Sequence, residues 1–221
     1  MRGGRRSSFY YPISLNLHGK KCVVVGGGVV ARRKVKGLLE HGAKVEVISP
    51  SVCSEIGELA KAGEISVKGK KYEPGDLHGA FMVIVATDES ETNLEVAQEA
   101  RRRKIPVNVV DSPEQSDFIV PAIVRREDLV IAVSTGGKSP ALARKIRTRL
   151  EKIFAEEYAS LTDLLDEVRS ELKQEQITLS GDEWQEALDL DLLLTLLRNG
   201  QRGGAKTSLW ASLKAVALRR H

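Results

Sequence analysis

Short apolar runs alternate with amphipathic stretches through the first half of the chain. The run Cys22–Val25 is continuous and rich in β-branched residues, which is typical of a strand buried on both faces of a parallel sheet. Apolar residues then recur at helical spacing over Val29–Leu39, and a second strand is predicted at Lys44–Ile48 after the helix stop His41-Gly42. This order predicts the first βαβ half of a dinucleotide-binding fold.

The same alternation continues to about residue 113. The further predicted elements are a helix over Ser51–Ala62, strands over Glu64–Lys68 and Phe81–Ala86, a helix over Glu91–Arg103 and a strand over Val107–Val110. Strands that alternate with helices indicate a doubly wound parallel sheet. We therefore predict an α/β, Rossmann-like domain over residues 1–113.

The pattern changes after this domain. Two strands are predicted at Phe118–Val124 and Leu129–Ser134, and Pro121 confines the first of them to an edge or a bulge. Ser139-Pro140 is a typical N-cap and first turn of a long helix. The predicted apolar face of that helix consists of Leu142, Ile146, Leu150 and Ile153. Residues 114–150 thus form a small β/α segment outside the parallel winding.

The remaining chain is helical in pattern. Helices are predicted over Leu161–Leu172 and Trp184–Leu197, and Gly200–Gly204 is expected to separate a short terminal segment that carries Trp210. We predict a helical C-terminal domain over residues 151–221. Its leucines, together with the edge strand before it, favour packing or self-association, so a homodimer is expected.

A glycine-rich turn joins the first strand to the first helix. Gly26, Gly28 and Ala31 fill the pattern G-x-G-x-x-G/A. In such a turn the first glycine permits a tight bend, the second lets the backbone approach a pyrophosphate, and the alanine allows the helix to pack closely on the strand. The helix N-terminus offers free N–H groups to the anion. A purely structural turn is the alternative, but the flanking elements at the right spacing favour a cofactor site.

The loop after the second strand bears on the identity of the cofactor. An Asp or Glu usually holds the ribose 2′-hydroxyl there, whereas this chain has Ser49, Pro50 and Ser51. Serine hydroxyls discriminate less against a 2′-phosphate. The residues themselves therefore leave NAD and NADP open.

Two further loops follow strands of the same predicted sheet, one with Thr87-Asp88 and the other with Asp111. Ligands of open α/β sheets bind outside the carboxyl ends of the strands, so these residues join the candidate cofactor site. The chemistry of Asp111 alone favours a structural role over a catalytic one: its side chain would cap a turn before Ser112-Pro113.

Composition and charge narrow the class of protein. The 42% hydrophobic and 29% charged residues are ordinary for a globular protein, no apolar run approaches a membrane span, and the N-terminal stretch MRGGRRSSFYYPISLNL reads as a disordered lead-in without a signal-peptide core. We expect a cytoplasmic protein that does not bind membranes. The net charge of +4 comes without a nucleic-acid motif, so a small polyanion is expected instead of nucleic acid. Scattered cysteines and histidines, His221 included, predict no metal site.

Four stretches together resemble a known family. The segments VVVGGGVVARRK, IVATD, NVVDSPEQSDFIVPAIV and VSTGGKSPALARKIR are similar to precorrin-2 dehydrogenases, the dehydrogenase and in some members ferrochelatase module of siroheme synthase. The resemblance covers about Tyr11–Leu172. It implies an NAD-binding domain, a central dimerisation segment and a helical domain that covers the tetrapyrrole site. No second large domain follows in this sequence, so the methyltransferase half of fused siroheme synthases is not expected.

The resemblance also implies site residues. The cofactor is then NAD, with contacts from Val29 and Val30 and from Pro50 and Ser51. The aspartate of the NVVD motif, which is tied to catalysis in the family, is Asp111 here. Phosphorylation of a serine in some members falls at the position of Thr135.

The implied reaction can be assigned to residues. Oxidation of precorrin-2 to sirohydrochlorin transfers a hydride to nicotinamide and releases protons, for which Asp111 is the expected general base or substrate orienter, supported by Asn108. The substrate carries eight carboxylates, so its binding residues should be basic or offer free amides. The candidates for substrate binding are Thr135, Gly136, Gly137, Lys138 and Arg144. Secondary Fe²⁺ insertion at the Asp111 pocket is a further expectation. An NAD(H)-binding redox sensor without turnover is the alternative.

Overall fold

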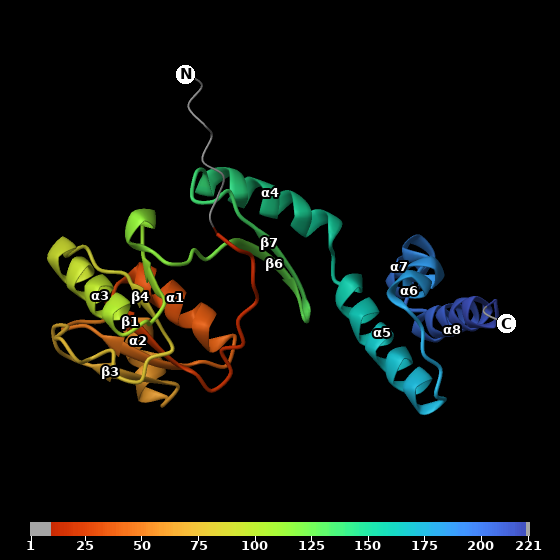
Figure 1. Ribbon diagram of the computed structural model, residues 1–221, viewed down its shortest axis with the longest axis horizontal. Helices are drawn as coiled ribbons and strands as arrows, with labels where there is room; N and C mark the ends of the chain where they lie inside the picture. The colour runs from red at the N-terminus through yellow and green to blue at the C-terminus, as the bar shows by residue number, and fades with distance from the viewer. Residues whose placement is uncertain (1–9, 220–221) are drawn as a thin grey trace, which may run out of the picture. The chain divides into compact units, whose positions relative to one another are not determined.

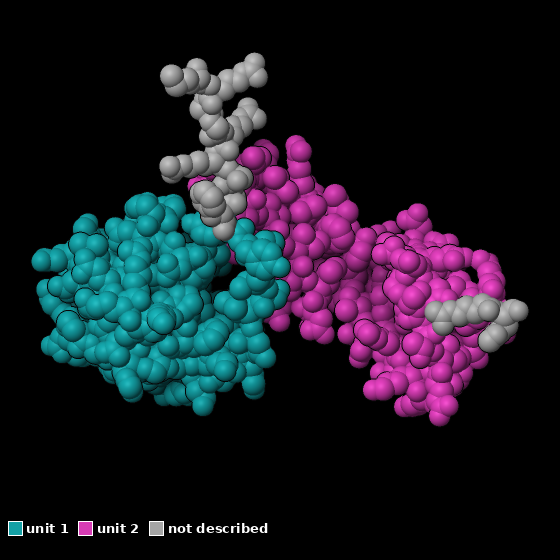
Figure 2. All heavy atoms as spheres, in the orientation of Figure 1, with its two compact units in different colours: residues 1–120 teal, residues 121–221 magenta. Residues whose placement is uncertain are grey.

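In the computed structural model, which describes residues 10–219, the internal contacts divide the chain into two units, Met1–Val120 and Pro121–His221 (Figure 2). Residues 1–9 of the expected lead-in and His221 lie outside the described residues. Residues 114–120 group with the first unit and residues 121–150 with the second, and the division into three domains stays a prediction. Among the described residues, no helix has both the length and the apolar character of a membrane span.

The first unit is built on a five-stranded sheet whose strands are all parallel (Figure 1). Its strands are β1 (Lys21–Val25), β2 (Lys44–Ile48), β3 (Ile65–Lys68), β4 (Met82–Val85) and β5 (Val107–Val109). They lie in the order β3-β2-β1-β4-β5, so the winding reverses between β1 and β4. The predicted Rossmann-like, doubly wound sheet is confirmed.

Helices cover both faces of this sheet. They are α1 (Val29–Leu39), α2 (Ser54–Lys61) and α3 (Ser90–Arg102). Side chains of α1 and α2 share a core with Val24 and Ile84 of the sheet, whereas those of α3 share a core with Val23 and Val83. Neighbouring residues of β1 therefore face opposite layers, and the strand is apolar throughout because both of its faces are buried.

A buried carboxylate fastens the long connection between β3 and β4. Glu99 of α3 is only 3% exposed and accepts hydrogen bonds from the Tyr72 hydroxyl and, at 2.9 Å, from the Gly75 amide. Arg103 Nε donates to the same carboxylate at 2.6 Å. Burial alone raises the pKa of Glu99, but the bonds from Tyr72, Gly75 and Arg103 outweigh it, so the pKa is lowered.

The segment after β5 differs from the prediction. After a short 3-10 turn, η1 (Pro113–Gln115), the chain runs along the free edge of β5, and its side chains take the place of another strand. Ser116 Oγ accepts from Val109 N at 2.9 Å, and an Asp117 carboxylate oxygen accepts from Val107 N at 3.1 Å. The strand predicted from Phe118 is therefore wrong at its start, and β6 begins only after Pro121, which has no N–H to donate.

The second unit begins with an antiparallel hairpin, β6 (Ala122–Arg126) and β7 (Leu129–Val133), on which α4 (Pro140–Ile153) packs. Ser139 caps this helix as predicted, because its hydroxyl accepts from Leu142 N at 3.2 Å.

The packed face of α4 is not the predicted one. Ala143 is buried, whereas Leu142, Ile146 and Ile153 are 51%, 36% and 58% exposed. Of the predicted apolar face, Leu150 alone is partly buried. Most of this apolar stripe therefore remains open to solvent.

Four helices complete the second unit (Figure 1). They are α5 (Glu157–Gln174), α6 (Gly181–Ala187), α7 (Leu190–Arg198) and α8 (Arg202–Leu218). Most of their leucines lie in one shared core, as expected for packing, whereas Leu190, Leu192 and Leu218 are exposed. The chain turns at Gly200, with φ of 72°, but Gly203 and Gly204 lie inside α8, so the predicted separator is shorter than expected.

Candidate functional site

The candidate site lies at the carboxyl edge of the parallel sheet, where the loops after β1, β2, β4 and β5 emerge. Main-chain bonds join these loops to one another. Gly26 N donates to Ile48 O at 2.9 Å, and Cys53 N donates to Gly27 O at 2.8 Å. The edge contains the reversal between β1 and β4, which is where doubly wound sheets bind nucleotides.

The three glycines of the turn have different roles. A Cβ at Gly26, whose φ is +118°, would lie 2.2 Å from Ala86 O, and one at Gly27 would lie 2.0 Å from Ser51 O. A Cβ at Gly28 would meet nothing within 4 Å, and its φ of −83° is open to any residue. Gly26 and Gly27 therefore allow the close approach of neighbouring loops, whereas Gly28 leaves open space above the helix start. The sequence pattern missed Gly27, because its steric partner lies in a distant loop.

Within residues 10–219, no hydrogen-bond partner occupies the first N–H groups of α1. Gly28 is the N-cap and has no side chain to accept from them, and no acidic residue occupies the first turn. Val29 and Val30 are 67% and 39% exposed at the same place, which is unusual for valine at a helix start. Ala31 is fully buried under the turn, as the pattern predicts. Open space, free amides and exposed apolar side chains together fit the pyrophosphate and an adjoining part of a dinucleotide.

The serines after β2 are not equivalent. Ser49 is 8% exposed, and its hydroxyl donates to Ser51 O at 2.6 Å, so Ser49 shapes the loop. Pro50 and Ser51 are exposed. Glu55 follows in the first turn of α2 and pairs with Arg32 of α1. The pKa of Glu55 is lowered to about 2, by hydrogen bonds from its own amide and from Ser54 and by the charge of Arg32.

The loop after β4 is fixed by its own threonine. Thr87 Oγ1 accepts from Glu89 N at 2.8 Å, and Thr87 O accepts from Asn93 Nδ2 at 3.1 Å. Asp88, which lies between Thr87 and Glu89, is exposed at the sheet edge. The predicted cofactor residues of this loop thus lie on the same edge as the glycine turn, with Thr87 engaged in the loop and Asp88 open.

Asp111 follows β5 on the same edge and has a left-handed backbone, with φ of 59°. Asp is one of the few residues other than glycine that adopt this conformation readily, and the side chain is exposed. Its charge acts on Lys34 of α1: burial and Arg33 lower the pKa of the Lys34 ammonium, Asp111 raises it, and the net pKa is lowered. A carboxylate and an ammonium on separate elements therefore lie near each other at this edge.

Asn108 is buried and bonds to the segment after the Asp111 loop, and it does not face solvent. Its side chain is 7% exposed, and Nδ2 donates to Phe118 O at 2.9 Å. A positioning role follows from this contact.

The predicted substrate residues form a separate cluster in the second unit, at the N-terminus of α4. Gly136 and Gly137 both have positive φ, of 61° and 82°, which favours glycine at each position. Thr135 Oγ1 accepts from Ser139 N at 2.9 Å, and Gly136 N donates to Ser134 Oγ at 3.1 Å, so the Gly136 amide is already engaged.

Lys138 and Arg144 of this cluster are exposed. Lys138 N donates to Thr135 O at 3.1 Å, which closes the loop ahead of α4. Arg144 lies on α4 itself.

Within residues 10–219, no three His, Cys, Asp or Glu side chains come together as metal ligands. Cys22 is fully buried, and burial raises the pKa of its thiol to about 11.

A doubly wound parallel sheet with this glycine turn defines a nucleotide-binding Rossmann protein. In agreement, a family model for NAD(P)-binding domains matches residues 13–122, and the model "Sirohaem biosynthesis protein central" matches residues 126–153. The solved structure of SirC, a precorrin-2 dehydrogenase, is 30% identical and superposes with a TM-score of 0.68 over 94% of this chain and 98% of SirC. The chain belongs to the precorrin-2 dehydrogenase family.

Curated relatives agree. The siroheme synthases of Methylobacillus flagellatus and Methylococcus capsulatus are 45% and 46% identical over 74% and 75% of this chain, which spans 35% of each relative's length. The superposition with SirC covers 94% of this chain, which requires that most of the residues after Gln174 are matched as well. This C-terminal part, which no sequence motif identified, therefore belongs to the shared fold.

Proposed function

We propose that this chain oxidises precorrin-2 to sirohydrochlorin with NAD as hydride acceptor, as a step of siroheme biosynthesis. The observation that carries the proposal is an exposed carboxylate, Asp111, on the same sheet edge as the open turn at Gly28. The reported name of SirC and the names of the siroheme synthases support the choice of substrate.

The cofactor residues follow from the turn. Gly26 would permit the tight bend, and Gly28 with the first amides of α1 would hold the pyrophosphate. Val29, Val30, Pro50 and Ser51 would contact the rest of the dinucleotide, as would Asp88 near Thr87. NAD, when bound, accepts the hydride that leaves the substrate. Glu55 supports NAD over NADP, because its carboxylate lies directly after the loop of Ser49 and repels a 2′-phosphate while it neutralises Arg32.

Asp111 would accept the proton that leaves with the hydride. Removal of one hydride and one proton converts a C–H and an N–H or C–H bond of the macrocycle into conjugation, so a base beside the nicotinamide completes the reaction. Lys34 of α1 interacts with this carboxylate by charge, and Asn108 of β5 positions the segment at Phe118 that follows the Asp111 loop.

Substrate carboxylates would bind at the start of α4. Arg144 and Lys138 supply positive charge, and Thr135, Gly136 and Gly137 form the loop that leads into the helix N-terminus. Insertion of Fe²⁺ would be secondary and would use the Asp111 pocket, since the macrocycle nitrogens are the final ligands.

The test is anaerobic turnover of fresh precorrin-2 with NAD or NADP, followed by absorbance. We expect NAD to be preferred, and Asp111→Asn to lower kcat by about 10²- to 10⁴-fold, the usual contribution of a general base. Glu95→Gln, an exposed carboxylate on α3 that is not among the site residues, is the control and should retain most activity.

Two results would redirect the proposal. Binding of NADH without any turnover by the unmutated protein would favour a redox sensor. Insertion of Co²⁺ or Fe²⁺ into sirohydrochlorin at the uncatalysed rate would leave a dehydrogenase alone.

A further inference from the structure

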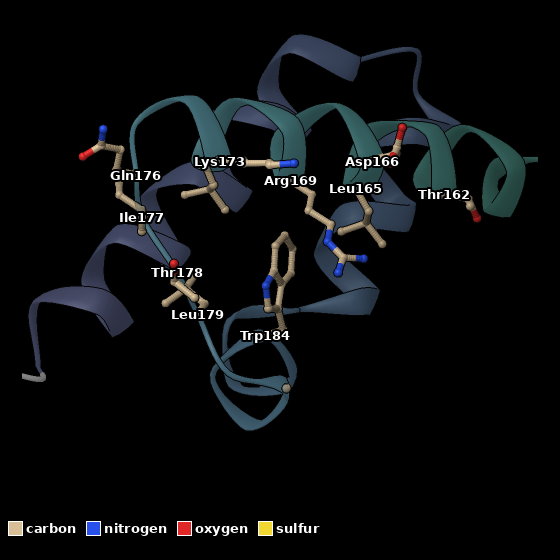
Figure 3. Close-up of a pocket in the computed structure, with 12 residues that line it drawn as sticks. Thr162, Leu165, Asp166, Arg169, Lys173, Gln176, Ile177, Thr178, Leu179 and Trp184 are labelled. Atoms are coloured by element: carbon tan, nitrogen blue, oxygen red, sulfur yellow. The ribbon is translucent and has the colours of Figure 1, made fainter.

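The second unit contains a cavity that none of the proposed catalytic residues lines. It has a volume of about 720 Å³ and lies between α5, α6 and the connection that joins them (Figure 3). This volume is within the range of small-molecule sites, roughly 300–1,000 Å³. The cavity is therefore large enough for a ligand of its own.

One part of the lining is apolar. It consists of Leu165, Leu172, Ile177, Leu179 and the indole of Trp184. Figure 3 shows the Trp184 ring rising from its helix into the space below α5. Trp184 is partly buried against the helical core, so its ring is held in place while one side remains accessible. A flat apolar ligand would find a fixed aromatic surface there.

The rest of the lining carries positive charge without a matching carboxylate. Arg169 and Lys173 are four residues apart on α5 and therefore share one face of the helix. Figure 3 shows Arg169 extending from α5 toward Trp184. Among the described residues, neither cation forms an ion pair, and Asp166 is the single acid in the lining.

Two further carboxylates of α5, Glu167 and Glu171, are engaged by α8 and do not line the cavity. Glu167 pairs with Arg202 at 2.6 Å and with Lys206 at 2.7 Å. Glu171 pairs with Lys206 at 2.5 Å and accepts from Trp210 Nε1 at 2.8 Å. The side of α5 that faces the cavity is thus left basic.

We propose that this cavity binds a flat, conjugated carboxylate, with its ring system against Trp184 and its carboxylate between Arg169 and Lys173. The apolar part of the lining would pack against the ring system, and Arg169 and Lys173 would form charged hydrogen bonds with the carboxylate. The ligand is either a tetrapyrrole or a smaller aromatic acid, since both share this chemistry.

The probe for the test is 2-naphthoate, with 2-naphthalenemethanol as its uncharged counterpart. The full chain is labelled with ¹⁵N, and its two tryptophans give two indole N–H signals, which Trp184→Phe assigns. For a ligand of this size, the acid should bind with a Kd of about 1 mM or tighter.

We expect 2-naphthoate to shift the Trp184 signal in a saturable manner and to leave the Trp210 signal in place. Arg169→Gln and Lys173→Gln should each weaken binding about 10-fold, the effect of losing one charged hydrogen bond. Lys214→Gln is the matched control, because this exposed lysine lies on α8 outside the cavity, and it should bind like the parent. All three positions are exposed, so the variants should fold, which circular dichroism checks.

Equal shifts by acid and alcohol, or equal affinity in the Arg169 and Lys173 variants, would overturn the proposal, as would the lack of any shift at several times this concentration. Competition by uroporphyrin III then shows which of the two ligand classes the cavity binds. Displacement of naphthoate at lower concentration indicates a tetrapyrrole, and its failure to displace indicates a smaller aromatic acid. The titration needs neither NAD nor turnover, so its outcome is separate from that of the proposed oxidation.

Discussion

The glycines of the cofactor turn have two different roles: some allow close packing of loops, and one leaves space for a ligand. Gly27 is constrained because a Cβ would lie 2.0 Å from Ser51 O, whereas a Cβ at Gly28 would enter open space. The pattern G-x-G-x-x-A identified Gly28 correctly as the open position, since the spacing of the motif is local. It could not identify Gly27, because the contact with Ser51 forms only when the loop after β2 folds back.

This division predicts opposite effects for two substitutions. Gly28→Val should raise the Kd for NAD at least about 10-fold while the protein remains folded, because the side chain enters the space left for the pyrophosphate. Gly27→Ala should instead destabilise the fold by about 1–3 kcal/mol through overpacking. Calorimetric titration and thermal unfolding measure the two effects. A folded Gly28→Val protein with parental NAD affinity would show that the glycine serves the turn alone.

At the scale of elements, the periodicity of apolar residues predicted the helices and strands of the first unit well. It predicted the segments that connect them poorly. The bounds Val29–Leu39 and Lys44–Ile48 agree with the structure, because helical spacing and strand runs are properties of the segment itself. The error at Phe118 arose because Ser116 and Asp117 satisfy the edge of β5 with side-chain oxygens, a tertiary arrangement without periodicity. The cavity between α5 and α6 also depends on tertiary packing, and no motif indicated it.

The connection between β3 and β4 depends on one ionised carboxylate. The folded pKa of Glu99 lies below its unfolded value of about 4.3, so its contribution is complete above that pH and is lost as the pH falls through the lower, folded pKa. We expect Glu99→Gln to reduce the free energy of unfolding by about 2 kcal/mol at neutral pH, since charged hydrogen bonds are lost. The difference from the parent should shrink in acid.

Urea unfolding of both proteins at neutral and acidic pH measures this effect. Glu95→Gln, an exposed acid on the same helix, is the control and should change stability little. A pH-independent difference between Glu99→Gln and the parent would mean that packing, and not the charge of Glu99, holds the connection.

At the scale of the whole molecule, one group of exposed apolar side chains lies within the segment that the central family model matches, on α4 and β7. The stripe of Leu142, Ile146 and Ile153 is exposed, and Val130 of β7 is 49% exposed. A stable dimer buries about 800 Å² per partner, more than three helix side chains supply, so the hairpin must contribute as well. The helices after Tyr158 offer less, because most of their leucines lie in their own core and only Leu190, Leu192 and Leu218 are exposed among those described.

We therefore expect a homodimer formed through residues 121–153, of twice the 24.2 kDa chain mass. Ile146→Glu combined with Leu142→Glu should yield the monomer, because two charges would be buried without partners in the interface. Leu190→Glu is the matched control: this leucine is 48% exposed at the start of α7, where an acid suits the helix dipole, and the variant should remain dimeric. Sedimentation velocity at micromolar concentration distinguishes the two masses. A parent protein that sediments as a monomer, or a control that dissociates as readily as the α4 variant, would place the interface elsewhere or remove it.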